Sequence, residues 1–327
     1  MSAPVKVAGF LVGLAMVFGA AIGIGSLFDP VAEPAAAHDA GDRMHETAGD
    51  AEHGGTDGHA DQTHATSTDD SAEEIPGGLM VSQAGYTFRL DDPALSPGRD
   101  VPVTFTIEGP DGPVTTYDIE HGKRLHLIAV RRDFSGFQHV HPELAADGTW
   151  STALDLSAGQ WRLYADFKPT GAGALTLGTD LAVAGDYRPA PPSAESRTAI
   201  VDGYTVTLIG ELTPGADSEL VLSVSRDGEP VTDLEPYLGA YGHLVALRAG
   251  DLAYLHVHPE GIPGDGGTEP GPDVTFFAAV PSAGSYHVYL DFKHEGVVRT
   301  ASFTLGTGAG SDAQEPTHDD PGGDHGH

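Results

Sequence analysis

Two histidine pairs occur in the same seven-residue pattern at two places in the chain. Residues 137–143 read FQHVHPE and residues 254–260 read YLHVHPE. On a β-strand, residues two apart point to the same face about 7 Å apart, so both histidines of a pair project together. Imidazole nitrogens bind transition-metal ions at about 2 Å, which allows one pair to share a single cation. The pairs are His139 with His141 and His256 with His258.

A third histidine precedes each pair by thirteen residues. His126 stands before the first pair and His243 before the second, and the intervening RRDFSG and RAGDL are typical of turns. If the first hairpin closes around residues 133–134, His126 lies opposite His141, and by the same offset His243 lies opposite His258. A register shifted by one residue would turn the third histidine to the other face of the sheet.

A carboxylate is available as a fourth ligand in each half. Asp166 and Asp291 stand in the matching stretches YADF and YLDF, among apolar neighbours typical of a core-facing strand. An ionised aspartate there is costly unless it is paired or coordinates a cation. Glu143, Glu260 and water are the alternatives. We therefore expect one metal site in each half: His126, His139, His141 and Asp166 in the first, and His243, His256, His258 and Asp291 in the second.

The ligand types restrict the ion that such a site selects. The chain has no cysteine and four methionines, which excludes thiolate ligands, disulfides and a Met-rich Cu(I) site. Histidine with carboxylate favours Cu(II), with Zn(II) and Ni(II) as the other candidates. A structural interpretation of the histidines stays open. Duplicated domains retain residues by common descent, and a half-buried imidazole can hydrogen-bond to the backbone.

The histidine pairs belong to a duplication that spans most of the chain. SAGQWRLYADFK at 157–168 matches SAGSYHVYLDFK at 282–293, and LHLIAVRRD at 125–133 matches GHLVALRAG at 242–250. The matching segments follow in the same order, which indicates two homologous domains. We place the first repeat at 78–186, a proline-rich linker at 187–197 and the second repeat at 198–307.

The elements that must position these residues are strands. Each repeat carries seven or so short strand signals, separated by Gly-, Pro- and Asp-rich turns, in about 105 residues, which predicts an antiparallel β-sandwich. AGQWRLY and AGSYHVY resemble the turn into strand F of immunoglobulin-like domains, with Leu163 and Val288 where a cysteine usually stands. The expected fold is all-β, with two tandem immunoglobulin-like β-sandwiches.

The N-terminus predicts a location outside the cytoplasm. Residues 7–28 form an uncharged apolar run long enough to span about 30 Å of hydrocarbon, and Lys6 is the only charge before it. This pattern places residues 1–6 in the cytoplasm and the rest of the chain outside. The run is either an uncleaved single-pass anchor in the cell membrane or a signal sequence cleaved after Ala37, which would give a secreted protein.

Acidic, histidine-containing segments flank the repeats. Residues 29–77 and 308–327 hold few large apolar residues, so we expect both to be disordered. Either they are solvated spacers, or their histidines and carboxylates collect cations. A formal net charge of −32 repels nucleic acid and attracts cations. The expected partners are the membrane, through the N-terminal helix, and a metal transporter or another extracytoplasmic protein; nucleic acid is not expected.

Two resemblances carry further expectations. LHVHPEGIPGDG resembles the copper-binding strand of Cu/Zn superoxide dismutases, but only His256 and His258 match, and the bridging histidine, zinc loop and disulfide of that family have no counterpart. The pattern His-Leu, Arg-Asp, Phe-X-His-X-His-Pro-Glu, Ala-Gly, Ala-Asp-Phe resembles poorly characterised membrane-anchored or secreted heavy-metal-associated proteins of bacteria. That resemblance covers both repeats and implies extracytoplasmic metal binding, in outline like periplasmic copper carriers.

These patterns predict a membrane-anchored metal-binding protein that captures, buffers or delivers Cu(II). The alternative is a non-enzymatic surface module that binds a protein or glycan, with structural histidines, and a superoxide dismutase-like copper enzyme is third. The chain has no Gly-X-Ser-X-Gly, phosphate-binding Gly-rich loop or HEXXH motif, so we do not expect an enzyme.

Overall fold

The structure, a computed structural model, describes residues 75–307. This range consists of short strands, many with alternating buried and exposed side chains, joined by turns and loops. Within this range there are twenty-one strands and no helix, and hence no helix long and apolar enough to cross a membrane. The predicted anchor or signal at 7–28, the predicted disordered segment at 308–327 and all but the last three residues of that at 29–77 lie outside the described residues.

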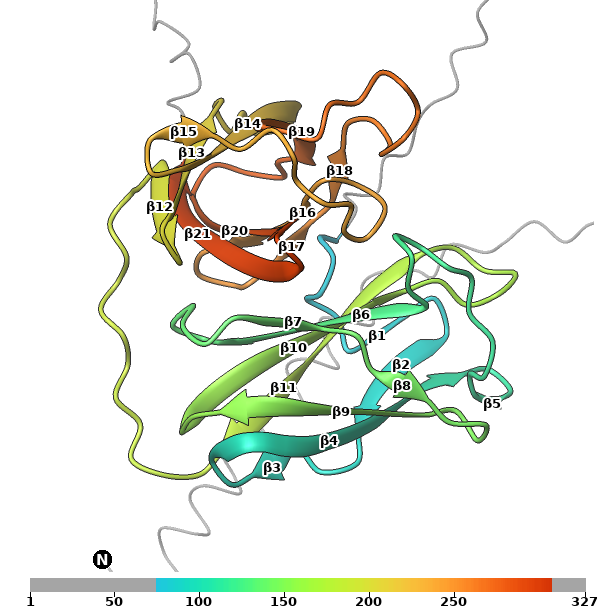
Figure 1. Ribbon diagram of the computed structural model, residues 1–327. Coiled ribbons are helices and arrows are strands. Elements are labelled where there is room, and N and C mark those ends of the chain that lie inside the picture. Colours follow the sequence, from blue (N-terminus) through green and yellow to red (C-terminus); the bar gives the residue numbers. More distant parts are fainter. Residues whose placement is uncertain (1–74, 308–327) are drawn as a thin grey trace, which may run out of the picture. The chain divides into compact units, whose positions relative to one another are not determined.

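The first sandwich consists of two antiparallel sheets (Figure 1). One sheet has the order β1 (Ser82–Gln83), β2 (Tyr86–Leu90), β4 (Gly98–Gly109), β9 (Thr149–Leu156), β8 (Glu143–Leu144), with β5 (Gly112–Pro113) paired to β4. The other has the order β3 (Ala94–Leu95), β11 (Leu175–Val183), β10 (Gly159–Phe167), β6 (Leu125–Arg131), β7 (Gln138–Val140). Only β3 pairs in parallel, with β11.

The second sandwich repeats this arrangement. One sheet has the order β12 (Thr198–Val201), β13 (Tyr204–Ile209), β14 (Asp217–Arg226), β19 (Asp273–Ala279), β18 (Val257–Pro259), with β15 (Glu229–Pro230) paired to β14. The other has the order β17 (Tyr254–Leu255), β16 (His243–Arg248), β20 (Ser285–His294), β21 (Val297–Gly306).

Both sandwiches have the strand order of immunoglobulin-like domains. The sheets β2-β4-β9-β8 and β13-β14-β19-β18 correspond to strands A, B, E and D, and β11-β10-β6 and β21-β20-β16 correspond to G, F and C. Trp161 Nε1 donates to the carbonyl of Ser157 at 2.8 Å, and Tyr286 OH donates to the carbonyl of Ser282 at 2.7 Å. These aromatic corners fix the turn into strand F. The prediction of all-β, immunoglobulin-like sandwiches is confirmed for the described residues.

Side chains along the central strands alternate between the core of their own sandwich and its outward face, and apolar side chains on the outward faces of both sandwiches pack together. Leu125, Leu127 and Ala129 of β6 point into the first core, and Leu244 and Ala246 of β16 into the second. The residues between them face outward. All described residues fall in one compact unit, and within it the outward side chains form a third apolar cluster: Ile128, Val130, Tyr164, Val245, Leu247, Leu252, Tyr254 and Tyr289.

Two reciprocal hydrogen bonds hold this interface between the sandwiches. Tyr164 of β10 donates its hydroxyl to the carbonyl of Leu252 at 2.7 Å, and Tyr289 of β20 donates to the carbonyl of Phe134 at 2.9 Å. Phe134 and Leu252 occupy equivalent turns and both have positive φ, 63° and 65°. The strand F tyrosine of each repeat therefore contacts the turn after strand C of the other, which is an approximate two-fold relation.

Candidate metal centre

A row of polar side chains crosses the outward face of each C–F–G sheet. In the first repeat, His126 lies directly opposite Asp166, and Asp166 opposite Thr176. In the second, His243 lies opposite Asp291, and Asp291 opposite Thr300. Because the core-facing positions alternate with these, both rows point toward the interface between the sandwiches and not into a sandwich core.

The first histidine pair joins this row through β7. His139 pairs with Ile128 of β6, and the same register places His141 beside His126, as the turn spacing predicted. The ring centroids of His126 and His141 are 5.0 Å apart, and those of His139 and His141 are 4.9 Å apart. One ligand atom from each of the three histidines lies within 4.8 Å of the others.

A second group of ligand atoms crosses to the other sandwich. His139, His243 and Asp291 also offer atoms within 4.8 Å of one another. His139 Nδ1 lies 2.7 Å from Asp291 Oδ2, and both side chains are at most 3% exposed. Thr300 Oγ1 donates to the other oxygen, Asp291 Oδ1, at 2.5 Å. The carboxylate expected at the first site therefore comes from the second repeat, and His139 belongs to both groups.

Three hydrogen-bond contacts run in series through two imidazoles. His126 Nε2 faces the carbonyl of Glu120 at 3.2 Å, and His126 Nδ1 faces His139 Nε2 at 3.0 Å. His139 Nδ1 then faces Asp291. Each contact needs one proton and each neutral imidazole carries one, so either a third proton resides on a ring or on the carboxyl group, or a bound cation takes the place of the proton between the two rings. When the two end contacts hold the protons, the lone pairs of His126 Nδ1 and His139 Nε2 point at each other.

Burial keeps the neighbouring imidazoles neutral. It lowers the pKa of His126 to about 3 and the pKa of His141 to about 4, and nearby His139 adds to both shifts. Burial also lowers the pKa of His243 well below its usual range. Neutral imidazole is the form that binds metal, so these rings are ligand-ready at neutral pH.

Two buried ring nitrogens in the cluster are unpaired. Neither His141 Nε2 nor His243 Nδ1 has a hydrogen-bond partner within residues 75–307. An unsatisfied buried polar atom costs about 1–3 kcal/mol, and most are paired in folded proteins. A cation bound by the lone pair of such a nitrogen would remove this cost.

The sequence profile of a family described as "Domain of unknown function (DUF8832)" matches residues 81–184 and 199–309. The chain belongs to this family. Its two DUF8832 repeats are the two sandwiches described above. No curated protein matches the chain.

The solved structures that match the chain include two bacterial adhesins and a set of FN domains. The Escherichia coli adhesin FdeC is 14% identical, covers 69% of this chain and 65% of its own, and has a TM-score of 0.22. The Yersinia pseudotuberculosis adhesin InvE is 11% identical, with coverages of 68% and 59% and a TM-score of 0.20. The FN1–FN3 domains of chicken CNTN1 are 11% identical, with coverages of 72% and 70% and a TM-score of 0.19. The chain spans about two thirds of the solved FdeC chain and a smaller share of the InvE chain. Sequence identities and TM-scores this low carry no inference about function.

The second DUF8832 repeat does not form the separate site expected from its sequence. Val257 and His258 pair with β19 of the opposite sheet, where His258 lies opposite Phe277 and not His243. His256 and His258 are exposed. The chain leaves the sheet of β16 after β17 ends at Leu255, and Val257 packs against the core from the other sheet.

The remaining predicted carboxylates lie apart from the histidine cluster. Asp166 accepts a hydrogen bond from Thr176 Oγ1 at 3.0 Å and lines a cavity beside the cluster. Glu143 and Glu260 are exposed and belong to neither group of ligand atoms. The histidines and carboxylates expected to form one complete set within each DUF8832 repeat instead form groups of ligand atoms that combine residues of both repeats.

His121 is a site residue that the sequence patterns did not indicate. Its ring centroid lies 6.2 Å from that of His126 and 6.0 Å from that of His243. The residue sits in the turn before β6 with a positive φ of 49°. Its five-residue spacing from His126 matches no strand or helix period, so only its proximity in sequence hinted at the site.

Proposed function

We propose that this chain binds one divalent transition-metal ion between its two sandwiches. The ligands are His126 Nδ1, His139 Nε2 and His141 Nε2. The observation that carries the proposal is that one ligand atom from each of these three histidines lies within 4.8 Å of the others, while His141 Nε2 has no hydrogen-bond partner within residues 75–307. A metal ion bound by His126 Nδ1 and His139 Nε2, which lie 3.0 Å apart, would take the unpaired His141 nitrogen as its third ligand.

Asp291 has a positioning role in this arrangement. Metal-binding histidines commonly donate their second ring N–H to a carboxylate, which fixes the tautomer and the ring orientation. His139 Nδ1 makes this contact with Asp291, and Thr300 holds the carboxylate in turn. Without sulfur ligands, three imidazoles favour Cu(II), with Zn(II) and Ni(II) next.

The proposed role is capture, buffering or delivery of the ion outside the cytoplasm. The apolar run at 7–28, whether anchor or signal, supports that location, and the net charge of −32 favours cations over nucleic acid. Eight of the seventeen histidines lie in the acidic segments, five before residue 75 and three after residue 307, and would collect ions for the folded site. A metal transporter or another extracytoplasmic protein is the proposed partner, and no catalytic step is proposed.

Co(II) titration of the full chain tests the proposal. An ion held by several imidazoles at low coordination number gives strong visible absorption, whereas loose sites on the acidic segments contribute equally to every variant. We expect the absorption to be lost in His139→Ala and in His141→Ala, and kept in His258→Ala, the matched control from the other histidine pair. Equal absorption in all four proteins would contradict the proposal.

A non-enzymatic surface interaction module is the second candidate function. It is supported by the immunoglobulin-like topology and by exposed apolar side chains on the outer face of the sheet β12–β13–β14–β19–β18, where Ile209 is 58% and Phe277 37% exposed. A purified extracytoplasmic partner bound equally by the parent and by His139→Ala, but not by Ile209→Ser with Phe277→Ser, would favour this function over metal binding.

A further inference from the structure

The two-fold relation between the repeats predicts a counterpart for every contact of the first site. His126, Asp166 and Thr176 correspond in register to His243, Asp291 and Thr300, and the two tyrosine hydrogen bonds across the interface are reciprocal. The contact of His139 with Asp291 should therefore be matched by a contact of His256 with Asp166.

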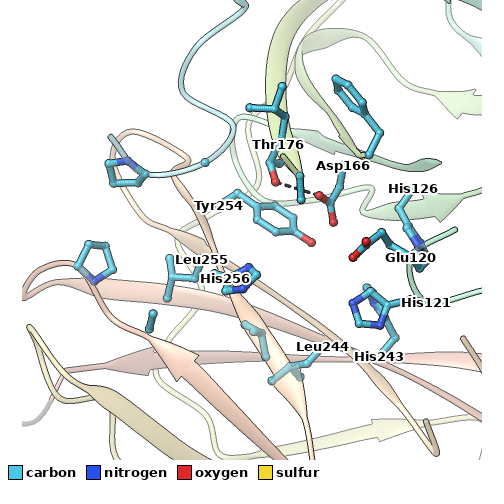
Figure 2. Close-up of a pocket in the computed structure, with 18 of the residues that line it drawn as sticks. Glu120, His121, His126, Asp166, Thr176, His243, Leu244, Tyr254, Leu255 and His256 are labelled. Atoms are coloured by element: carbon cyan, nitrogen blue, oxygen red, sulfur yellow. Dashed lines mark hydrogen bonds between the residues drawn. The ribbon is translucent and has the colours of Figure 1, made fainter. Parts of the chain in front are cut away.

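A cavity of about 670 Å³ lies where that counterpart is expected. Its lining includes Asp166, His256, His243, His126 and His121, drawn from both sandwiches, and Figure 2 shows these side chains around one space. Thr176 holds the Asp166 carboxylate just as Thr300 holds that of Asp291. The carboxylate and the histidines of the counterpart site thus line one open volume.

The asymmetry between the two halves has a local cause. In the second repeat the chain crosses to the other sheet about three residues earlier than in the first, so β18 begins at Val257 while β8 begins at Glu143. His256 consequently stands at the cavity wall. Tyr254, two residues before His256, donates its N–H to the carbonyl of Gly77 at 2.9 Å, and the segment 75–77 also lines the cavity.

Side chains that can bind a cation line the cavity, together with Lys123 and Arg124. Asp166 is half-buried and lines the cavity. A carboxylate in such a place is costly without a partner, and no hydrogen bond other than that of Thr176 reaches it within the described residues. His243 contributes a buried ring nitrogen without a partner.

We propose that this cavity is a second divalent metal-ion site, with Asp166, His243 and His256 as its ligands, which fills after the first. The inference rests on the proposed function of the first site. The ligand atoms of these residues are not among the groups of the described chain that lie within 4.8 Å of one another, so the bound ion draws the exposed His256 toward Asp166. This ordering makes the second site the weaker one.

Stepwise Co(II) titration of the full chain, followed by visible absorption, tests the second site. We expect two phases in the parent. Asp166→Asn, which is nearly isosteric, and His256→Ala, at an exposed position, should each weaken the second phase by at least the 10–100-fold typical of a lost second-shell partner and leave the first unchanged. Equal metal-free melting temperatures of the variants confirm that they fold.

The remaining variants separate the possible failures. If Asp166→Asn and His256→Ala titrate like the parent while His139→Ala loses the first phase, the second site is overturned and the first stands. If His139→Ala also titrates like the parent, both are overturned. If His258→Ala loses the second phase while Asp166→Asn keeps it, the ion binds the exposed pair His256 and His258, whose ring centroids are 4.0 Å apart. That result would overturn the cavity site.

Discussion

His139 is the residue on which the composite site depends, because its two ring nitrogens face different groups. Nδ1 lies against Asp291 of the other sandwich and Nε2 against His126 of its own. A carboxylate at Nδ1 holds the proton there and leaves the Nε2 lone pair for a cation. One imidazole thereby links metal affinity to a residue 152 positions away in the chain.

Asp291→Asn tests this link. The amide can still accept from His139 but carries no charge, so we expect the affinity for Zn(II) to fall about 10–100-fold with the stoichiometry unchanged. Competition titration against a chromophoric chelator measures the change. Asp273→Asn, an exposed carboxylate of β19, is the matched control. An unchanged affinity in Asp291→Asn would remove the positioning role.

The buried histidines predict an acid-sensitive metal-free protein. The pKa of His126 is about 3 and that of His141 about 4 in the folded protein, both below the usual 6.5 of an unfolded chain. Between these folded values and 6.5, the unfolded chain therefore binds more protons than the folded protein. Their contribution to stability is present above about pH 6.5 and is lost as pH falls toward 4. We expect the urea midpoint to fall between pH 7 and pH 5, and less so in His141→Ala. A urea midpoint that does not change with pH in either the parent or His141→Ala would contradict the lowered pKa values of these histidines.

At the scale of elements, the point at which the chain crosses between sheets decides which histidines meet. The first hairpin was predictable, because the turn at 133–134 and a period of two fix the register that brings His141 beside His126. The second was not, because the same HVHPE sequence pairs with β19 instead. The local sequence does not determine which sheet the HVHPE segment joins. That depends on the tertiary packing of Val257 against the core of the second sandwich.

The source of the carboxylate was also beyond sequence reasoning. Asp166 and Asp291 occupy identical positions in the repeats, and in the structure each lies opposite the histidine of its own repeat. The strand pattern made them look core-facing, whereas they face the interface between sandwiches. A period of two separates the faces of a strand but does not say which face meets another domain.

The interface hydrogen bonds give a prediction at the same scale. Tyr164→Phe removes a hydroxyl that donates to the carbonyl of Leu252, so we expect the free energy of unfolding to fall by about 0.5–1.5 kcal/mol. Urea unfolding of metal-free protein measures it. The two-fold relation predicts a similar loss for Tyr289→Phe. No loss in either variant would indicate that the interface is not formed in solution.

At the scale of the molecule, the site couples metal binding to the docking of the two sandwiches. The three proposed ligands belong to the first sandwich, and Asp291, which orients His139, belongs to the second. The ion therefore stabilises the folded first sandwich and, through the contact of His139 with Asp291, its association with the second.

Zn(II) should therefore stabilise the whole described unit. At a free concentration 100 times its Kd, one bound ion raises the free energy of unfolding by about 2.7 kcal/mol. We expect this gain in thermal unfolding of the parent and its absence in His139→Ala. A comparable gain in both proteins would place the stabilising ion elsewhere.

Long-range ¹H–¹⁵N NMR of the histidine side chains, at one equivalent of diamagnetic Zn(II), tests the central claim most directly, because it reports each ring nitrogen separately. The account predicts coordination shifts at Nδ1 of His126 and at Nε2 of His139 and His141, with Nδ1 of His139 still protonated. Unshifted resonances of these three residues, with shifts confined to histidines before residue 75 or after residue 307, would contradict it.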